Sequence, residues 1–429
     1  MGNTYLEVKK EKLWNKNFLL LWQGQLVSAL GDMLYIFALE FWILDVTGST
    51  TIMGLLTTLT MLPRIVLGPF IGVLVDRYNK KKVIVITDFI RGILITVVGI
   101  SAIIGVIEVW MAFVVAVISG ICAAFFNPAV MAIKPDIVPK SRLVQANSAT
   151  SLAQSGMNMI GNGIGGVLYI TLGASYLFLF NGLSYLFSAF TEIFISVEST
   201  VNKNFKVDFK EEFKEGFRFV WKFKTLRNIF LCNSILNFCF SGGMMLLKVY
   251  CTEISFLGVK GYGYLMTVFS IGAIISSTLL TMIKLERKLK FKAYVCSLII
   301  FSITIFFLPL MKNYVLMMII MFTMAFFNRI FNVILDSTKM LAIPANKRGQ
   351  VLSILRTFSM GLAPLGTLVA GILSEFISVK YVMMLLFTVG ILSIITCILV
   401  KGSKTLVEYE GQDFSLDDLI NNTNKLYDM

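Results

Sequence analysis

The stretch GPFIGVLVDRYNKKK, residues 68–82, decides the fold. Its first part is apolar and contains Gly68 and Gly72, small residues one turn apart that let a second helix approach closely. It then reaches the acid–base pair formed by Asp76 and Arg77 and ends in a run of lysines. Because lysine favours the cytoplasmic interface of a membrane, the stretch predicts a helix that leaves a bilayer at its basic end.

The composition of the 429-residue chain is that of a helical membrane protein. Hydrophobic residues make up 57% of it and the mean hydropathy is +0.80, which excludes an ordinary soluble domain. A spanning helix needs about 20 mostly apolar residues, and the alternation of a membrane β-barrel is absent from the sequence. We predict an all-α fold of twelve spanning helices, near residues 18–43, 50–74, 83–105, 109–132, 144–169, 174–196, 228–250, 262–283, 293–311, 314–338, 350–376 and 380–400.

The net charge of +13 indicates membrane orientation rather than nucleic-acid binding. Most of the 38 Lys and Arg lie before the first predicted helix, after the last, or in the connections at 77–82, 134–142, 203–227, 284–292 and 339–348. The connections on the other side hold Lys260, Lys312 and Lys380. This pattern predicts a multi-pass membrane protein with both termini in the cytoplasm. We expect the membrane to be the cytoplasmic membrane of a bacterium.

A polar stretch divides the predicted helices into two sets of six. Residues 1–196 form the N-terminal half, 197–227 a cytoplasmic linker, 228–400 the C-terminal half, and 401–429 an acidic tail expected to be mobile or loosely docked. Aromatic residues recur every four positions in the linker, at Phe205, Phe209, Phe213, Phe217 and Trp221. With basic residues one step behind them, they predict an amphipathic helix, either on the membrane surface or packed under the bundle.

The two halves contain a faint internal repeat. AFFN at residues 124–127 recurs at residues 325–328, 201 positions later, and each copy is followed by a proline and basic residues. Because the copies occupy equivalent places in the two halves, duplication is the favoured explanation.

The opening stretch resembles the loop signature G-x-L-x-D-R-x-G-R-K, which joins the second and third helices in the major facilitator superfamily. Its positions are occupied by Gly72, Leu74, Asp76, Arg77, Lys80 and Lys81. Asn79 stands where the signature has glycine, and asparagine tolerates the left-handed conformation that we expect in the turn.

Other stretches resemble the drug:proton antiporter branch, which includes macrolide and multidrug efflux proteins. They are WQGQ at 22–25, SALGD at 28–32, TGS at 47–49, NPA at 127–129, PDIVP at 135–139, ANS at 146–148 and RGQV at 348–351. The antiporter signature G-P-x-x-G-G reads GNGIGG at 161–166, so Asn162 replaces its proline and weakens the expectation of a kink there. The resemblance implies two six-helix halves and transport by alternating access.

The same resemblance implies a cytoplasmic gate. Asp76, four residues after Gly72, is expected to approach the start of the eleventh helix near Gly349, where free amides and the helix dipole attract a carboxylate. Arg77 is expected to pair with Asp136 at the end of the fourth helix. These contacts would hold the cytoplasmic side shut in the outward-facing state.

Two carboxyl residues of the first predicted helix are candidates for proton coupling. Asp32 lies at mid-helix, and Glu40 follows a little over two turns later, roughly on the same side and nearer the outer surface. Ionisable groups at membrane depth are costly and usually face protein or a water-filled cavity. Since the chain contains no histidine, a proton relay would depend on carboxylates. The alternative role for Asp32 is that of a structural hydrogen-bond partner.

Several basic residues within the predicted helices are candidates to compensate these acids, and for each of them structural pairing is favoured over substrate contact. They are Arg64, Arg329 and Arg356. Two further pairs of opposite charge are spaced three residues apart, which predicts ion pairs within single helices: Asp88 with Arg91, and Asp336 with Lys339.

Candidates for the substrate cavity are polar residues of the fifth, sixth, tenth and eleventh predicted helices: Asn158, Asn162, Asn181, Arg329 and Arg356. The glycines between 156 and 166 are favoured as helix-packing positions. The sequence contains no Walker A motif, metal-ligand cluster or histidine-based triad, so ATP-driven export by this chain alone and enzymatic activity are not expected. Neither a cofactor nor a metal is expected.

The leading interpretation is a proton-coupled secondary exporter of amphiphilic small molecules, that is, a drug or multidrug efflux protein linked to antibiotic resistance. Its expected partners are the substrate, protons and the lipid bilayer, with no nucleic acid, and it is expected to be a monomer. One alternative is an exporter of a self-made metabolite such as a siderophore or peptide antibiotic. Another is a non-transporting membrane receptor or scaffold.

Overall fold

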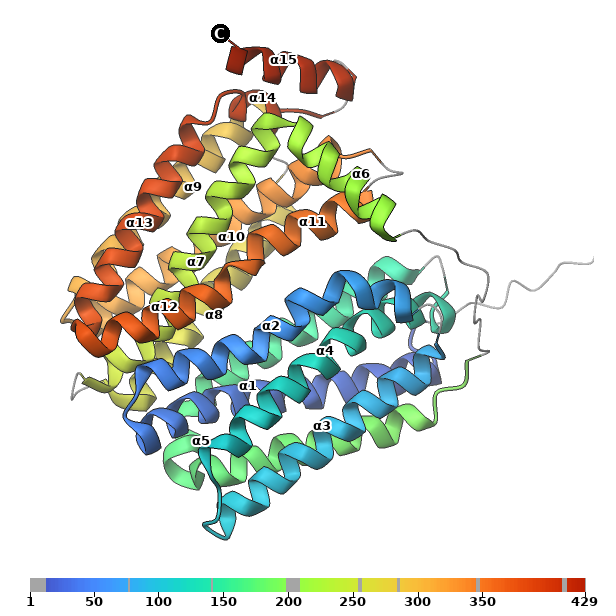
Figure 1. The fold of residues 1–429 in the computed structure, drawn as a ribbon, viewed down its shortest axis with the longest axis vertical. Coiled ribbons are helices and arrows are strands. Elements are labelled where there is room, and N and C mark those ends of the chain that lie inside the picture. Colours follow the sequence, from blue (N-terminus) through green and yellow to red (C-terminus); the bar gives the residue numbers. More distant parts are fainter. Residues whose placement is uncertain are drawn as a thin grey trace, which may run out of the picture.

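A computed structural model describes the protein over residues 13–75, 78–139, 142–197, 209–253, 257–283, 286–344, 348–410 and 415–428. Within these ranges the secondary structure is helical and contains no strand. The long helices are apolar enough to cross a membrane, and they form two packed groups (Figure 1). The predicted all-α membrane fold is therefore confirmed.

The N-terminal half consists of five helices: α1 (Lys16–Thr47), α2 (Thr50–Val75), α3 (Lys80–Ile103), α4 (Val109–Ile137) and α5 (Leu143–Ile193). Of these, α5 contains two crossings that meet at Gly173, where φ is 81° and ψ is 169°. Glycine adopts such a positive φ without steric cost. The predicted fifth and sixth crossings are thus the first and second halves of α5, and six crossings are present.

The C-terminal half repeats this arrangement with α7 (Lys224–Glu253), α8 (Gly258–Met282), α9 (Arg287–Phe307), α10 (Tyr314–Ala342), α11 (Arg348–Gly361), α12 (Ala363–Phe376) and α13 (Val379–Leu399). A single 3-10 turn follows α9 at Leu308–Leu310. The helices α11 and α12 form one crossing that is interrupted at Leu362, because Pro364 lacks the N–H that would continue the helix. The two halves together give the twelve predicted crossings.

Close helix packing inside each half depends on glycine at a few positions. A Cβ added to Gly31 of α1 would lie 2.5 Å from Asn181 Oδ1 in the second half of α5. A Cβ added to Gly242 of α7 would lie 2.6 Å from the carbonyl oxygen of Gly366 in α12. Only glycine lets these backbones approach so closely, which is how small residues promote helix association in membranes.

The linker helix α6 (Phe209–Lys222) packs under the C-terminal half. Phe217 stacks on Trp221 with ring centroids 5.3 Å apart and lies 6.2 Å from the ring of Phe358 in α11. Val220 and Phe223 are buried, whereas Trp221 is 53% exposed. The packed position is thus one of the two that the sequence left open, while Phe205 lies outside the described residues.

The C-terminal tail is docked, which corrects the expectation of a mobile or loosely held segment. It forms α14 (Ser403–Val407) and α15 (Leu416–Asp428), whose Leu406 and Leu419 are fully buried. Glu410 accepts a hydrogen bond from Lys290 Nζ at 2.5 Å, and Asn424 Oδ1 accepts one from the backbone N–H of Lys224. Apolar burial and these polar contacts hold the tail against the C-terminal half.

The two halves converge at one end of the bundle, where α12 meets α2, and their ribbons spread toward the end that carries α6 (Figure 1). We call the first the closed end and the second the linker end. The helices α5 and α8 make a second contact between the halves. The candidate residues can be placed relative to these two ends.

Candidate functional site

Asp32 lies midway along α1 and faces two side chains from the second half of α5. The Tyr185 hydroxyl donates a hydrogen bond to Asp32 Oδ1 at 2.6 Å, and Asn181 Nδ2 lies 3.5 Å from the same oxygen. Both partners are buried, with exposed fractions of 4% and 0%, while Asp32 stays partly accessible. Asp32 is therefore an oriented carboxyl at membrane depth that remains within reach of water.

Arg91 of α3 supplies the nearest buried positive charge. Its Nη1 donates to the Tyr185 hydroxyl at 2.8 Å, and its Nη2 lies 3.0 Å from Asp88 Oδ1. The guanidinium also sits 4.5 Å from the centroid of the Tyr185 ring and 4.8 Å from that of Phe126 in α4. The intrahelical pair of Asp88 and Arg91 was predicted, but the sequence did not reveal that Arg91 also reaches the Asp32 site.

A third buried acid adjoins this cluster. Glu192, near the end of α5, is fully buried and accepts a hydrogen bond from Ser188 Oγ at 3.3 Å. Its charge interacts with those of Asp88 and Arg91 across the interface between α3 and α5. Glu192 is not among the residues predicted from the sequence. Its spacing of seven residues from Tyr185, which places both on one helix face, was the available signal.

The basic residues proposed as compensators take different positions. Arg64 of α2 lies within electrostatic range of both Asp32 and Arg356 of α11. Arg329 of α10 instead donates its Nε to Ser277 Oγ of α8 at 2.8 Å. The side chains of all three arginines are exposed. The predicted pair of Asp336 and Lys339 is present within α10, at 2.6 Å.

The asparagine candidates in the first half of α5 lie near the boundary between the halves. The helix runs without a break through Asn162, in keeping with the missing proline. A Cβ on Gly263 of α8 would lie 3.0 Å from the carbonyl oxygen of Asn162, and Asn158 is half-buried. The nearby Gly163 and Gly166 abut α8. These glycines thus pack helices, as their spacing favoured, and Asn181 lies apart from them, buried beside Asp32.

Glu40 does not join Asp32 but forms an ion pair between the halves. Its carboxylate binds Lys248 Nζ of α7, and both side chains are largely buried. Lys248 Nζ also lies 5.7 Å from the ring centroid of Tyr262 in α8, against which Phe41 packs. This pair links α1 to α7 toward the closed end. The sequence placed Glu40 near the outer surface but did not connect it with Lys248.

Hydroxyl groups complete the contact at the closed end. Thr58 Oγ1 of α2 lies 2.7 Å from the carbonyl oxygen of Pro364 and 3.1 Å from Thr367 Oγ1, both in α12. At the end of α12, Glu375 accepts hydrogen bonds from the Ser49 hydroxyl and from the backbone N–H of Thr51. Each bond crosses between the halves, so separation of the halves here requires all of them to break.

Three of the predicted gate residues, Gly72, Asp136 and Gly349, lie at the linker end. Asp76 and Arg77 fall outside the described residues, Gly72 lies in α2, and Gly349 lies in the first turn of α11. Asp136 is bound by Lys80 Nζ at 2.8 Å. The gate contacts therefore stay predictions.

Asn79 differs from its expected conformation. Its φ is −67°, and its side chain caps α3 by accepting a hydrogen bond from the backbone N–H of Lys82 at 3.1 Å. The left-handed turn expected for Asn79 is therefore wrong. Asparagine serves here because it is a strong N-cap residue.

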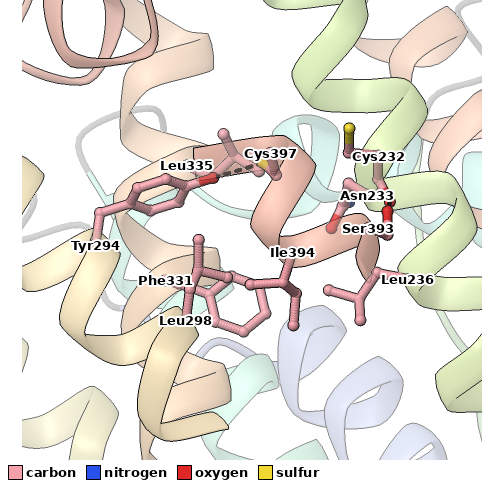
Figure 2. Close-up of a pocket in the computed structure, with 10 residues that line it drawn as sticks. All are labelled: Cys232, Asn233, Leu236, Tyr294, Leu298, Phe331, Leu335, Ser393, Ile394 and Cys397. Atoms are coloured by element: carbon pink, nitrogen blue, oxygen red, sulfur yellow. Dashed lines mark hydrogen bonds between the residues drawn. The ribbon is translucent and has the colours of Figure 1, made fainter. Parts of the chain in front are cut away.

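A small pocket inside the C-terminal half is lined by α7, α9, α10 and α13 (Figure 2). Tyr294 and Cys397 meet across it, with the hydroxyl oxygen and the sulfur 3.2 Å apart, and Asn233 and Ser393 face it from α7 and α13. Its free volume is about that of one water molecule. This pocket is too small for a transported compound.

Two packed six-helix halves with an oriented carboxyl at membrane depth define a polytopic membrane transporter. The profile of a family described as transmembrane secretion effector matches residues 11–419. The chain belongs to this family of major facilitator transporters.

Sequence relatives include known efflux proteins. Macrolide efflux protein A of Streptococcus pyogenes is 32% identical over 162 residues, which is 38% of this chain and 40% of that protein. The match thus spans less than half of the macrolide relative. The multidrug efflux pump Tap of Mycolicibacterium fortuitum is 23% identical over 83% of this chain and 89% of Tap. The chain is therefore a transporter with efflux proteins among its relatives.

Solved structures of transporters share the fold. The nucleoside transporter NupG has a TM-score of 0.73 at 11% identity, covering 89% of this chain and 99% of NupG. A bacterial homologue of the iron transporter ferroportin, in an inward-facing state, has a TM-score of 0.66 at 14% identity, covering 89% and 98%. At these identities the likeness shows the major facilitator fold alone.

Proposed function

We propose that the chain is a secondary exporter that moves amphiphilic small molecules out of a bacterial cell in exchange for protons. The efflux relatives support export, and the observation that carries proton coupling is the setting of Asp32. Its carboxyl is held by Tyr185, lies near the charges of Arg91 and Arg64, and remains partly accessible. A carboxyl in such a place can bind and release a proton as its surroundings change.

The distribution of lysine and arginine supports a cytoplasmic linker end and an outward-facing closed end. With this orientation the structure is an inward-facing state, in which Asp32 is reached from the cytoplasm. Substrate would enter between the halves and meet Asn158, Asn162, Arg329 and Arg356. Rocking of the halves around this region would then expose the substrate to the outside.

Glu40 would couple the outer side to protons. Opening the closed end separates Glu40 from Lys248, which leaves two charges without a partner. Loss of one partner from a buried ion pair costs about 3–5 kcal/mol. A proton arriving on Glu40 from the outside would remove one of these charges as the halves part, so that uptake of protons and release of substrate occur in the same state.

The gate at the linker end would act in the opposite state. When the linker end closes, Asp76 would reach the start of α11 near Gly349 and Arg77 would replace Lys80 on Asp136. The ion pair of Lys80 with Asp136 keeps that carboxylate oriented in the meantime. A cysteine pair at Asp76 and Gly349 that forms a disulfide only when Glu40→Gln is also present would support this exchange of states.

The proposed function is tested by transport into everted membrane vesicles with an imposed pH gradient, acid inside. Radiolabelled erythromycin, ethidium and an iron-loaded siderophore serve as probes. We expect the native chain to concentrate at least one amphiphilic probe, and Asp32→Asn to lose gradient-driven accumulation. Asp417→Asn, at an exposed position of α15, is the matched control and is expected to behave as the native chain.

Two results would count against the proposal. Accumulation that is equal in the native chain and in Asp32→Asn would remove the coupling role of Asp32. Transport of the siderophore with neither of the other probes would point to the export of a self-made metabolite.

A further inference from the structure

The site of this inference is a buried charge cluster between α3 and the second half of α5, on the linker-end side of Asp32. It contains Asp88, Arg91 and Glu192, whose exposed fractions are 0%, 5% and 0%. The coupling roles in the proposed function belong to Asp32 and Glu40. Asp88 and Glu192 have none, although buried carboxyls are among the most costly groups in a membrane protein.

A row of contacts and charge interactions joins Asp32 to Glu192. Tyr185 donates to Asp32 at 2.6 Å and accepts from Arg91 at 2.8 Å. Arg91 lies 3.0 Å from Asp88. Ser188 donates to Glu192 at 3.3 Å, and the charges of Asp88 and Glu192 interact. Arg91 interacts electrostatically with all three acids, so it links Glu192 to Asp32.

The charges in this cluster do not balance. Arg91 is the cation in the cluster as defined above. Its ion pair is with Asp88 rather than with Glu192. The other titratable groups that face the cluster are Asp32 from α1, Tyr185 from α5 itself and Cys122 from α4, none of which carries a positive charge, while Arg64 of α2 acts on Asp32. Two buried carboxyls thus share one guanidinium.

Carboxyl oxygen atoms without a hydrogen-bond partner indicate which acid of the cluster carries a proton. Within the described part of the chain, neither Glu192 Oε2 nor Asp88 Oδ2 has a hydrogen-bond partner, although both are buried. Asp88 has the guanidinium beside it. A buried carboxyl without a compensating charge becomes neutral by taking a proton, and Glu192 is the acid in that situation.

We propose that Glu192 is a second proton-binding residue of this transporter and that it titrates together with Asp32 through the shared charge of Arg91. When Asp32 is ionised, its negative charge opposes ionisation of Asp88 and Glu192, so the proton on Glu192 is held firmly. When Asp32 is neutral, Arg91 no longer compensates it, so its positive charge acts on Asp88 and Glu192 and Glu192 releases its proton more readily. Groups that interact in this way titrate as a unit.

The proposal is tested by infrared spectroscopy of the purified full chain in lipid, recorded as a function of pH. We expect a carbonyl band of a protonated carboxyl that Glu192→Gln removes. In Asp32→Asn the same band is expected to disappear at a pH lower by about one unit, because a nearby negative charge has been removed. Asp417→Asn is the matched control and is expected to leave the band and its pH dependence unchanged.

The outcomes separate this proposal from a structural role for Glu192. A spectrum that Glu192→Gln does not change, or a band whose pH dependence is the same with and without Asp32→Asn, would overturn it. If Glu192→Gln does not fold, Ser188→Ala removes the hydroxyl that stabilises the ionised carboxylate. The band should then persist to higher pH, and an unmoved band would overturn the proposal.

The contribution of Glu192 to transport rests on the proposed function, whereas this measurement does not. It needs no substrate and reports protons bound by the chain itself. Equal export by the native chain and by Asp32→Asn would rule out the proposed coupling of transport to Asp32. The coupled titration of Glu192 and Asp32 would still be measurable in that case. Failure of either proposal is therefore recognised separately.

Discussion

Asp32 and Arg91 both hydrogen-bond to Tyr185, where α1, α3 and the second half of α5 pack together. At the corresponding place in the C-terminal half, Asn233 and Tyr294 face a small pocket between α7, α9 and α13 (Figure 2). The offset of 201 residues that relates the two AFFN copies takes Asp32 to Asn233. Among the described residues, the most deeply buried charged side chains belong to the N-terminal half: Glu40, Asp88, Arg91, Lys134 and Glu192. Lys248 of the C-terminal half is also largely buried, but its partner is Glu40 of the N-terminal half.

This difference separates what the fold requires from what function requires. In the C-terminal half, the three equivalent helices pack with hydroxyl, amide and thiol groups between them, as Tyr294 and Cys397 illustrate. Charge at this position is therefore unnecessary for packing six helices. Its presence in the N-terminal half agrees with a coupling role that one half alone performs.

The largest effect is expected from removing the cation of the charged half. Arg91→Ala leaves Asp88 and Glu192 buried without compensation, which should lower the free energy of unfolding by about 3–5 kcal/mol. Tyr294→Phe in the uncharged half removes one hydroxyl contact and should cost about 1 kcal/mol. Thermal unfolding in detergent measures both. If the two substitutions destabilise the protein equally, the halves do not differ as described.

The next largest effect concerns the location of the carboxyl. The double variant Asp32→Asn with Asn233→Asp moves the carboxyl to the C-terminal half. Among the described residues, no buried cation like Arg91 lies near it there. We expect gradient-driven accumulation of the transported probe to fall about tenfold, as in Asp32→Asn alone. Vesicle transport is the measurement, with Asn233→Asp alone as the control. Recovery of export in the double variant would show that either half can couple protons.

A smaller effect is expected at the contact between the halves. Glu40→Gln leaves Lys248 without its partner and should favour opening of the closed end about fivefold. Spin labels at the exposed Val46 and Tyr381, in a Cys296→Ser background, would report the opening as a longer distance between the labels.

The matched control for this prediction is the double variant Glu40→Gln with Lys248→Met, which removes both charges. It should return most of the population to the closed distance. If Glu40→Gln leaves the distance distribution unchanged, the ion pair does not hold the closed end shut.

The smallest effect is expected from the neutral part of the same contact. Thr58→Val keeps the shape of the side chain but removes the hydroxyl that bridges α2 to α12. The loss should shift the closed state by about 0.5 kcal/mol, at the low end for one hydrogen bond, because the carbonyl oxygen of Pro364 keeps the bond from the Thr367 hydroxyl. The same spin-label distances measure it. A shift as large as that of Glu40→Gln would mean that charge is not what distinguishes the two contacts.

Local features of the site followed from the sequence. Asp88 with Arg91 and Asp336 with Lys339 were predicted as pairs because residues three apart share a helix face, and both pairs are present. Asp32 was chosen because an acid at membrane depth is costly. The N-cap of Asn79 was missed, because the signature suggested a glycine-like turn where a helix begins.

Long-range partners did not follow from the sequence. Asp32 and Tyr185 are 153 positions apart, and Glu40 and Lys248 lie in different halves. Hydropathy fixes how many helices there are but not how each is rotated about its own axis. That rotation decides which side chains meet.

The sequence by itself determined the twelve crossings, the two halves and the acids that lie at depth, because hydrophobicity and helical period are local properties of the chain. Only the tertiary structure decided that Arg91 interacts with Asp32 as well as with Asp88, and that Glu192 adjoins them without a further cation among the described residues. The physical reason is close packing. Glycines such as Gly31 bring α1 against α5 at one rotation, and that rotation places the charges together.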